Sequence, residues 1–327
     1  MNILITGGAG YIGSHIVEKL VKIKSNKIYI IDNLSTGYTR LVNKKAKFIK
    51  GNINNQKLLK KIINKDKIHA IIHLAASLNI SEAEKNKKKY TKNNIEGTKN
   101  LILSCKNSNV KMIIFSSSCS IYGNINGKVN ETNQTNPKGY YAFTKLKGEK
   151  LIIKYAKKLN YKFGIFRYFN VAGASLSGKI GEIEKSHGHL IKNLAIQATK
   201  KNSIINIFGK NYKTKDGTCI RDYIHVSDLV DIHIKGIKIL QDKKKSFIVN
   251  CGYGRGYSVL DIVKIFKKYK KKVKVNFVKK RPGDVAKVFS NTTKLRKMMK
   301  WKPRFNDINL ILKSSIDWEK KLNKLKK

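Results

Sequence analysis

The feature that most constrains this chain is a glycine-rich turn near its N-terminus. The apolar run Ile3-Leu4-Ile5 precedes Thr6-Gly7-Gly8-Ala9-Gly10-Tyr11-Ile12-Gly13, and apolar residues then recur at helical spacing. In a strand–turn–helix of this kind, Gly7 permits a tight turn, Gly10 lets the backbone approach a pyrophosphate, and Gly13 lets the helix pack closely on the strand. Free N–H groups and the helix dipole favour an anion at the helix start. The turn therefore predicts a dinucleotide-binding domain.

The end of the next predicted strand indicates which dinucleotide is bound. The segment Lys27–Ile31 is typical of a strand and is followed by Asp32. This is about the distance downstream of the turn at which a carboxylate binds a ribose diol. The negative charge of Asp32 would repel a 2′-phosphate, so the sequence predicts NAD rather than NADP.

A second group of polar residues lies in the middle of the chain. A short apolar strand, Met112–Phe115, leads into Ser116-Ser-Ser118, and Tyr141 and Lys145 follow one turn apart on a predicted helix. An ammonium beside a phenol favours the phenolate, so the pKa of Tyr141 is expected to fall. Such a phenol can act as a base near neutral pH, and a neighbouring serine hydroxyl can share the same substrate oxygen. We expect a proton-transfer site here.

The chain alternates between strand-like and amphipathic segments. The predicted strands are Asn2–Ile5, Lys27–Ile31, Lys47–Ile49, Ala70–Leu74, Lys111–Phe115 and Phe163–Phe169, with helical segments such as Gln56–Asn64, Asn93–Cys105 and Thr144–Lys158 between them. This alternation predicts an α/β fold with a doubly wound parallel (Rossmann) sheet. The pattern loosens after Asn170. We expect a dinucleotide-binding domain over residues 1–170 and a smaller α+β substrate-binding domain over residues 171–327, with some elements interdigitating.

The formal charge of +50 raises the question of a nucleic-acid partner. The lysines are spread over the whole chain and accompany abundant Asn and Ile, a joint bias that A/T-rich codons would produce. Runs of lysine on helix faces and turns are usually solvated surface. We therefore expect weak, salt-sensitive contact with polyanions and no specific nucleic-acid partner.

Several other classes of protein are disfavoured. No apolar run is long enough to span a bilayer, and no basic segment precedes the first apolar run, so neither a membrane anchor nor a signal peptide is expected. The four cysteines are scattered, which favours a reducing, cytoplasmic location over a disulfide framework. His69 and His73 flank a strand, and His187 and His189 lie in a polar turn without acidic neighbours placed to ligate. No metal site is expected.

The motifs together resemble the extended short-chain dehydrogenases/reductases. They comprise Thr6–Gly13, Asp32-Asn-Leu34, His73-Leu-Ala-Ala76, Asn93-Asn94, Ser116–Ser118, Tyr141 with Lys145, and Arg167-Tyr-Phe-Asn170. Later stretches resemble the UDP-glucose 4-epimerase family specifically: Ile207-Phe-Gly209, Asp216-Gly-Thr-Cys-Ile-Arg-Asp-Tyr-Ile-His-Val226 and Arg281-Pro-Gly-Asp284. The similarity runs along nearly the whole chain.

The resemblance implies reversible epimerisation of UDP-galactose and UDP-glucose at sugar C4 through a 4-keto intermediate. In the family, the tyrosine matching Tyr141 takes the proton of the 4-hydroxyl while a hydride leaves C4 for NAD+. Lys145 would hold the nicotinamide ribose and depress the pKa of the phenol. Ser118 would bridge O4 of the sugar and the phenol. The resemblance also implies a homodimer.

The remaining site residues are those that match the family. The implied cofactor-binding residues are Gly7, Gly10, Tyr11, Ile12, Gly13, Asp32, Asn33, Asn52, Ile53, Leu74, Ala75, Ala76, Asn93, Ser116, Tyr141, Lys145 and Tyr168. The implied substrate-binding residues are Ser118, Tyr141, Asn170, His189, Leu190, Phe208, Arg221, Tyr223, Arg281, Asp284 and Val288. Among the latter, the arginines would pair with phosphate oxygens and Phe208 would offer uracil a flat apolar surface.

Two positions bear on how closely this chain follows the family. Asn52 stands where the family often has an aspartate that contacts the adenine amino group, and its carbonyl oxygen can still accept that hydrogen bond. Val288 matches the position that gates the sugar N-acetyl group, and its small side chain suggests that UDP-GlcNAc and UDP-GalNAc are also accepted.

Two alternatives remain open. One is another nucleotide-sugar enzyme of the same fold, such as a dehydratase, a decarboxylase or a UDP-GlcNAc/uronate epimerase. A dehydratase would need acids beside the serine, where this chain has Cys119 and Ser120. The other alternative is a non-catalytic NAD-binding regulator, which the presence of Tyr141, Lys145 and Ser118 disfavours.

Overall fold

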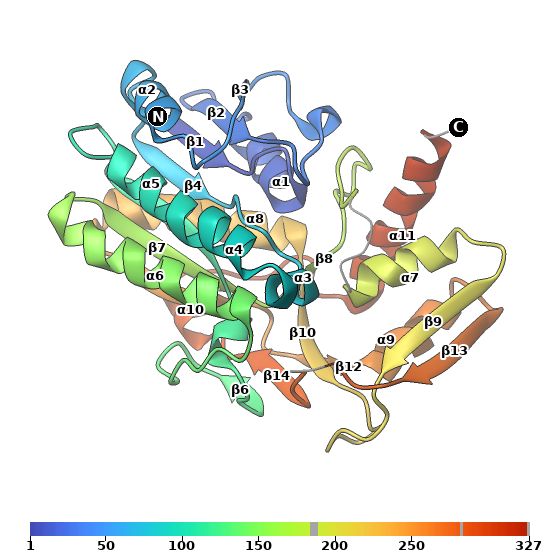
Figure 1. Cartoon of the computed structure of the whole chain (residues 1–327). Helices are drawn as coiled ribbons and strands as arrows, with labels where there is room; N and C mark the ends of the chain where they lie inside the picture. Colours follow the sequence, from blue (N-terminus) through green and yellow to red (C-terminus); the bar gives the residue numbers. More distant parts are fainter. Residues whose placement is uncertain (184–188, 282–283, 326–327) are drawn as a thin grey trace. The chain divides into compact units, whose positions relative to one another are not determined.

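The computed structural model describes residues 1–183, 189–281 and 284–325 (Figure 1). The chain forms two compact units. The N-terminal unit comprises Met1–Ile121, Thr135–Arg167 and Val230–Val249, and the C-terminal unit comprises Tyr122–Gln134, Tyr168–Leu229 and Asn250–Lys327. The sequence predicts a boundary after residue 170 with some interdigitation. The chain passes between the units at 167–168, and each unit also takes one segment from the other half of the sequence.

The N-terminal unit is built on a seven-stranded sheet with the order β11-β7-β5-β4-β1-β2-β3. These strands are β1 (Asn2–Thr6), β2 (Lys27–Asp32), β3 (Lys47–Lys50), β4 (Ala70–His73), β5 (Met112–Ser118), β7 (Lys162–Tyr168) and β11 (Phe247–Cys251). The pairs from β3 to β5 are parallel. All six predicted strands lie in this sheet, and the predicted α/β class is confirmed. The sheet also includes β11, which the sequence pattern does not predict.

Helices cover both faces of this sheet (Figure 1). On one face lie α2 (Gln56–Lys65), α5 (Gly97–Ser104) and α6 (Tyr140–Lys158), packed side by side. On the other lie α1 (Tyr11–Leu20) and α8 (Val226–Asp242), which share an ion pair between Lys19 and Asp231 at 4.0 Å. Between β4 and α5 the chain forms α3 (Ile80–Lys85), α4 (Lys87–Tyr90) and a π-helical turn, η2 (Thr91–Glu96). No helix among the described residues has both the length and the apolar character required to cross a bilayer.

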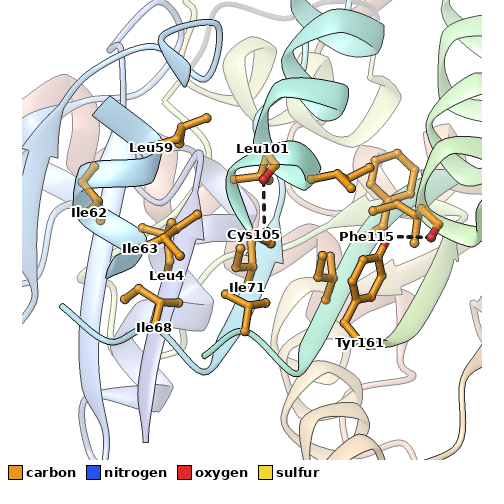
Figure 2. Packing of buried hydrophobic residues seen from close by; sticks show 14 of the residues in the cluster. Leu4, Leu59, Ile62, Ile63, Ile68, Ile71, Leu101, Cys105, Phe115 and Tyr161 are labelled. Atoms are coloured by element: carbon orange, nitrogen blue, oxygen red, sulfur yellow. Dashed lines mark hydrogen bonds between the residues drawn. The ribbon is translucent and has the colours of Figure 1, made fainter. Parts of the chain in front are cut away.

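The core follows from the two-residue period of the strands. Alternate residues such as Leu4, Ile71 and Phe115 point to the face covered by α2, α5 and α6, where Leu59 and Leu101 meet them (Figure 2). The intervening strand residues are buried on the other face. Burial on both faces is typical of parallel sheets and explains why these strands are continuously apolar. Each such side chain contributes about 1.5–3 kcal/mol when fully buried.

The C-terminal unit contains smaller sheets. The strands β6 (Gly127–Val129), β10 (Ile220–His225), β12 (Gly256–Ser258) and β14 (Lys287–Ser290) lie in the order β12-β10-β14-β6, and β8 (Asn170–Ala172) pairs with β10. The strands β9 (Ser203–Phe208) and β13 (Val273–Val278) form a parallel pair. The helices are α7 (Leu190–Ala198), α9 (Val259–Lys267), α10 (Thr293–Met299) and α11 (Ile308–Lys324), and α7 packs on α11.

A buried carboxylate holds the strands of this unit together. Asp222 of β10 is fully buried and accepts hydrogen bonds from the N–H groups of Tyr253 (2.9 Å), Gly254 (2.9 Å) and Ser290 (3.1 Å). Its Oδ2 also accepts from the Ser290 hydroxyl at 2.5 Å. These bonds compensate for the burial of the charge. They tie β10 to β14 and to the loop after β11, and so position the neighbouring Arg221.

Candidate active site

Because of its glycines, the turn before α1 has backbone atoms that no side chain covers. Gly7 has a φ of +73° and donates its N–H to the carbonyl of Ile31 in β2 at 2.9 Å. A Cβ on Gly7 would lie 2.8 Å from the backbone nitrogen of Ala75, and a Cβ on Gly13 would overlap the carbonyl oxygen of Gly7. Gly10 is the extended residue that caps α1. Side chains at these glycines would fill the space beside the backbone. The space that the glycines leave open fits the pyrophosphate of a dinucleotide.

Replacing Gly13 by alanine is expected to destabilise the turn by about 1–3 kcal/mol, because the added Cβ forces apart the strand and the helix. Dinucleotide affinity should fall with it, since the N–H groups at the helix start move. Thermal unfolding and titration with NAD measure the two effects. Gly139→Ala is the matched control, because its Cβ would meet only the end of the Glu84 side chain at 3.2 Å. Equal losses in both variants would contradict this account of the turn.

The predicted ribose-binding carboxylate lies at the end of β2, over the glycine turn. Asp32 is nearly buried, and its two oxygens accept from the N–H groups of Ala9 (3.0 Å) and Leu34 (2.8 Å). Burial raises the pKa of Asp32, and these two hydrogen bonds act in the opposite direction. The next residue, Asn33, is exposed and accepts from the N–H of Ser35 at 3.0 Å. The structure therefore brings Asp32 to the turn, as a ribose contact requires.

A buried series of side-chain hydrogen bonds begins at the same turn. The hydroxyl oxygen of Thr6 accepts from the N–H groups of Leu74 and Ala75, each at 3.2 Å, so its own hydrogen is free for Nδ1 of His73 at 2.7 Å. Nε2 of His73 then donates to the hydroxyl of Thr98 at 2.9 Å. Burial, and next the charge of Lys145, lower the pKa of His73 to about 3, so the imidazole is neutral. His73 thus connects the ends of β1 and β4.

The series of hydrogen bonds continues through the π-helical turn to α6. Thr98 donates to the carbonyl of Asn94 at 2.6 Å. The side chain of Asn94 donates to the hydroxyl of Thr144 on α6 (3.0 Å) and accepts from the N–H of Ser77 (2.8 Å). Asn93, the predicted cofactor residue, donates to the hydroxyl of Ser77 at 3.1 Å. In this series of hydrogen bonds, Asn94 is recognisable from the sequence only as part of a motif, and Thr98 and Thr144 are not recognisable at all. Asn94 and Thr144 are 50 positions apart, so they form no local pattern.

The predicted proton-transfer residues lie together where β5 meets α6. Tyr141, the second residue of this helix, is partly buried, and its phenol is hydrogen-bonded to the hydroxyl of Ser118. The prediction that the pKa of Tyr141 falls is wrong. Burial raises the pKa of the phenol above its ordinary value, the hydrogen bond with Ser118 lowers it, and the thiol of Cys119 raises it. Desolvation of the phenolate outweighs the nearby Lys145.

Lys145 is held against the same strand. Its Nζ donates to the carbonyl of Ser116 at 2.9 Å and lies 3.4 Å from the hydroxyl of Ser116. It also lies 5.4 Å from the ring centre of Phe115 and 6.0 Å from that of Tyr141. Burial lowers the pKa of Lys145 to about 7, and the charge of Glu149 raises it. The ammonium therefore titrates near neutral pH.

Glu149 is one turn beyond Lys145 on α6 and forms a buried ion pair. Nε of Arg167 donates to one carboxylate oxygen at 3.0 Å, and NH2 donates to the other at 2.8 Å. Both side chains are almost fully buried. In the sequence, Arg167 is recognisable only as part of a family motif, and Glu149 belongs to no motif. The signal available was a carboxylate at helical spacing from Tyr141 and Lys145.

The other predicted cofactor residues lie at the ends of elements. Tyr11 and Ile12 open α1, Asn52 and Ile53 follow β3, Ala76 follows β4 and Tyr168 ends β7. The side chain of Asn52 is exposed and accepts from the N–H of Asn54 at 2.9 Å, whereas Ile53 is buried. Tyr168 belongs to the C-terminal unit, unlike the rest of this set.

The residues predicted to contact phosphate and uracil lie in the C-terminal unit. The guanidinium of Arg281 lies 3.8 Å from the ring centre of Phe208, at the end of β9. Arg221 on β10 is paired with Asp284 at 3.4 Å and also donates to the carbonyl of Ile220. Pro282 and Gly283, the centre of the Arg281–Asp284 motif, lie outside the described residues. A cationic, aromatic surface of this kind suits a pyrimidine diphosphate.

Three further predicted substrate residues lie on neighbouring strands of the same unit. Val288 on β14 is buried and pairs in register with Arg221. Asn170 on β8 pairs with Tyr223 and donates its side-chain N–H to the carbonyl of Asp222 at 3.0 Å. Tyr223 is buried, and burial raises the pKa of its phenol.

His189 and Leu190 lie at the start of α7, His189 as the capping residue and Leu190 as the first helical one. The expectation that no acidic side chain neighbours His189 is wrong, because its Nδ1 lies 3.2 Å from a carboxylate oxygen of Glu182. His187 lies outside the described residues.

The chain is similar in sequence to proteins of a known family. Residues 3–252 match the model of the NAD dependent epimerase/dehydratase family. The chain is 39% identical to a UDP-glucose 4-epimerase of Lactobacillus helveticus, over 98% of this chain and 97% of that protein.

Solved structures agree in fold over almost the full length. A UDP-glucose-4-epimerase from Stenotrophomonas maltophila with bound NAD and formylated UDP-arabinopyranose superposes with a TM-score of 0.94, at 30% identity and 99% coverage of both chains. The UDP-Glc/GlcNAc 4-epimerase of Campylobacter jejuni superposes with a TM-score of 0.85, at 36% identity, over 98% of this chain and 99% of that one.

Proposed function

The chain belongs to the NAD dependent epimerase/dehydratase family, and from this premise we propose that it interconverts UDP-galactose and UDP-glucose at sugar C4 through a 4-keto intermediate. The observation that carries the proposal is the cluster of Ser118, Tyr141 and the buried Lys145 at the end of β5, in a chain similar to UDP-glucose 4-epimerases over nearly its full length. The cofactor is NAD, which the glycine turn and Asp32 fit.

NAD+ supplies, when bound, the acceptor for the hydride of C4 and later its donor. The protein supplies the rest. Tyr141 takes the proton of the 4-hydroxyl and returns it, and the hydroxyl of Ser118 favours the phenolate form of Tyr141 by a hydrogen bond to its oxygen. Lys145, charged below its pKa of about 7, stabilises the phenolate and binds a ribose hydroxyl. Because Lys145 is buried, its charge acts strongly on the neighbouring phenol oxygen.

We further propose that the C-terminal unit binds the nucleotide part of the substrate. Arg221 and Arg281 would pair with the diphosphate, Phe208 would stack on uracil, and Asp284 would accept from ribose hydroxyls. Firm attachment of the nucleotide lets the sugar itself stay loosely held. The 4-keto sugar must turn over to present its other face to the same hydride donor, so loose binding of the sugar serves this reaction.

A dehydratase is less well supported. Elimination of water needs an acid next to the proton-transfer serine, and this chain has Cys119 and Ser120 there. A regulator without catalytic activity would have no use for the hydrogen-bonded Tyr141–Ser118 pair.

The test is incubation of the purified protein with UDP-galactose, without added NAD, followed by separation of the sugar nucleotides. Formation of UDP-glucose would support both epimerisation and a retained cofactor. Turnover only after NAD is added would mean weak cofactor binding, consistent with the exposed Asn52. Failure on every UDP-hexose, with NAD present, would refute the proposal.

The sugar range is proposed to include UDP-GlcNAc and UDP-GalNAc, because the side chain of Val288 is small. Val288→Tyr is expected to lower the activity on UDP-GlcNAc by about 10- to 100-fold, since the ring would occupy the space of the acetyl group. Activity on UDP-galactose should change little. The conservative variant Val288→Ala is the control and should keep both activities. A Val288→Tyr enzyme that still converts UDP-GlcNAc would contradict this assignment.

We propose a homodimer in the cytoplasm as the working form. Two apolar side chains of α6, Phe143 and Ile153, are 36% and 43% exposed, which suits a helix that packs against a second copy. All four cysteines are free, which suits a reducing compartment. Sedimentation of the purified protein measures the assembly state directly.

A further inference from the structure

The hydroxyl of Ser118 receives two hydrogen bonds from one residue. Ser120 lies in the 3-10 turn η3 (Cys119–Tyr122) that follows β5. Its hydroxyl donates to Oγ of Ser118 at 2.9 Å, and its backbone N–H donates to the same oxygen at 3.2 Å. A serine oxygen has two lone pairs and carries one hydrogen. With both lone pairs engaged, the hydroxyl of Ser118 can act only as a donor.

The hydrogen of Ser118 has one partner on the reacting side, the phenol of Tyr141. We propose that Ser120 is a positioning residue for proton transfer, which commits Ser118 to donate to the oxygen of Tyr141. This inference deepens the proposed epimerase reaction and rests on it. Hydrogen bonds in such a series polarise one another, so the hydroxyl of Ser120 strengthens the bond from Ser118.

The proton balance of the step is simple. Tyr141 reacts in its phenolate form, which the hydrogen bond from Ser118 favours against the effect of burial; it takes the proton of the substrate 4-hydroxyl and becomes a neutral phenol. Ser118 keeps its own proton throughout and shifts only the strength of its hydrogen bond. No proton passes to Ser120. When the sugar oxygen is reprotonated, Tyr141 gives the proton back and the bond from Ser118 again stabilises the phenolate.

Other groups also act on the phenol and have to be kept constant in a test. Lys145 lies on the same helix, and Glu149 lies beyond it. Cys119 follows β5, and Tyr90 at the end of α4 interacts with Tyr141 electrostatically. None of these is altered by a change at Ser120, so an effect of that change on Tyr141 is transmitted through Ser118.

The experiment compares Ser120→Ala, Ser120→Thr and Ser117→Ala with the wild type. The pH dependence of kcat/KM is measured with UDP-galactose, and the absorbance of tyrosinate is titrated for each protein against its Tyr141→Phe counterpart. Ser120→Ala removes one donor, so the acid limb and the tyrosinate transition should both move up by about half to one pH unit. Ser120→Thr keeps the hydroxyl and should restore both curves.

Ser117→Ala is the matched control, because the hydroxyl of Ser117 is buried in the same strand and makes no hydrogen bond among the described residues. It should leave both curves unchanged. An active Ser120→Ala enzyme with wild-type curves would overturn the inference, and so would an equal shift in Ser117→Ala. If the wild type does not epimerise, the proposed function fails, and the tyrosinate titration still decides the role of Ser120.

Discussion

Tyr141→Phe is expected to lower epimerisation of UDP-galactose by about 100- to 10,000-fold, because it removes the group that takes the substrate proton. The ring stays in place, so the buried apolar contacts around it remain. Stability at neutral pH should therefore change little. The measurement is the initial rate with UDP-galactose together with thermal unfolding of both proteins.

The neighbouring tyrosine provides the control for this prediction. Tyr140 opens the same helix, but its hydroxyl is hydrogen-bonded to Thr91 at 2.5 Å, and the residue four positions on is Thr144, not a lysine. Tyr140→Phe should keep most of the activity. Full activity in Tyr141→Phe would remove this tyrosine from the mechanism and leave the proton without an acceptor.

Arg167→Met is expected to destabilise the protein by about 3–5 kcal/mol at neutral pH, because it leaves the carboxylate of Glu149 buried without its partner. Urea unfolding of the wild type and of Arg167→Met at neutral pH measures this effect.

The double variant Glu149→Met with Arg167→Met removes both charges and should recover much of the stability, as replacement of a buried pair by apolar groups often does. A single variant as stable as the wild type at neutral pH would show that Glu149 is not held as a buried anion.

The two variants also separate the roles of the charges around Lys145. Glu149 raises the pKa of Lys145 against the effect of burial, which lowers it to about 7. When Glu149 becomes protonated or is replaced, Lys145 should lose its charge at a lower pH. The alkaline limb of the pH–rate profile would then move toward lower pH.

The parts of the site that the sequence predicts are those with local geometry. The glycine turn, Asp32 at the end of the next strand, and Tyr141 one helical turn before Lys145 all follow from the spacing of a few residues on a strand or helix. The doubly wound sheet follows from the alternation of apolar strands with amphipathic helices. Backbone geometry sets these relations, so they can be recognised before the chain is folded.

Only the tertiary structure decided how these residues behave. Burial determines that the pKa of Tyr141 rises instead of falling, and no spacing along the chain reports how much water a fold excludes. The ion pair between Glu149 and Arg167 and the chain from His73 to Asn94 join residues that meet only in the folded protein. Solvation and long-range pairing depend on packing in three dimensions, and for this reason the sequence alone determined where the chemistry lies but not how its charges are tuned.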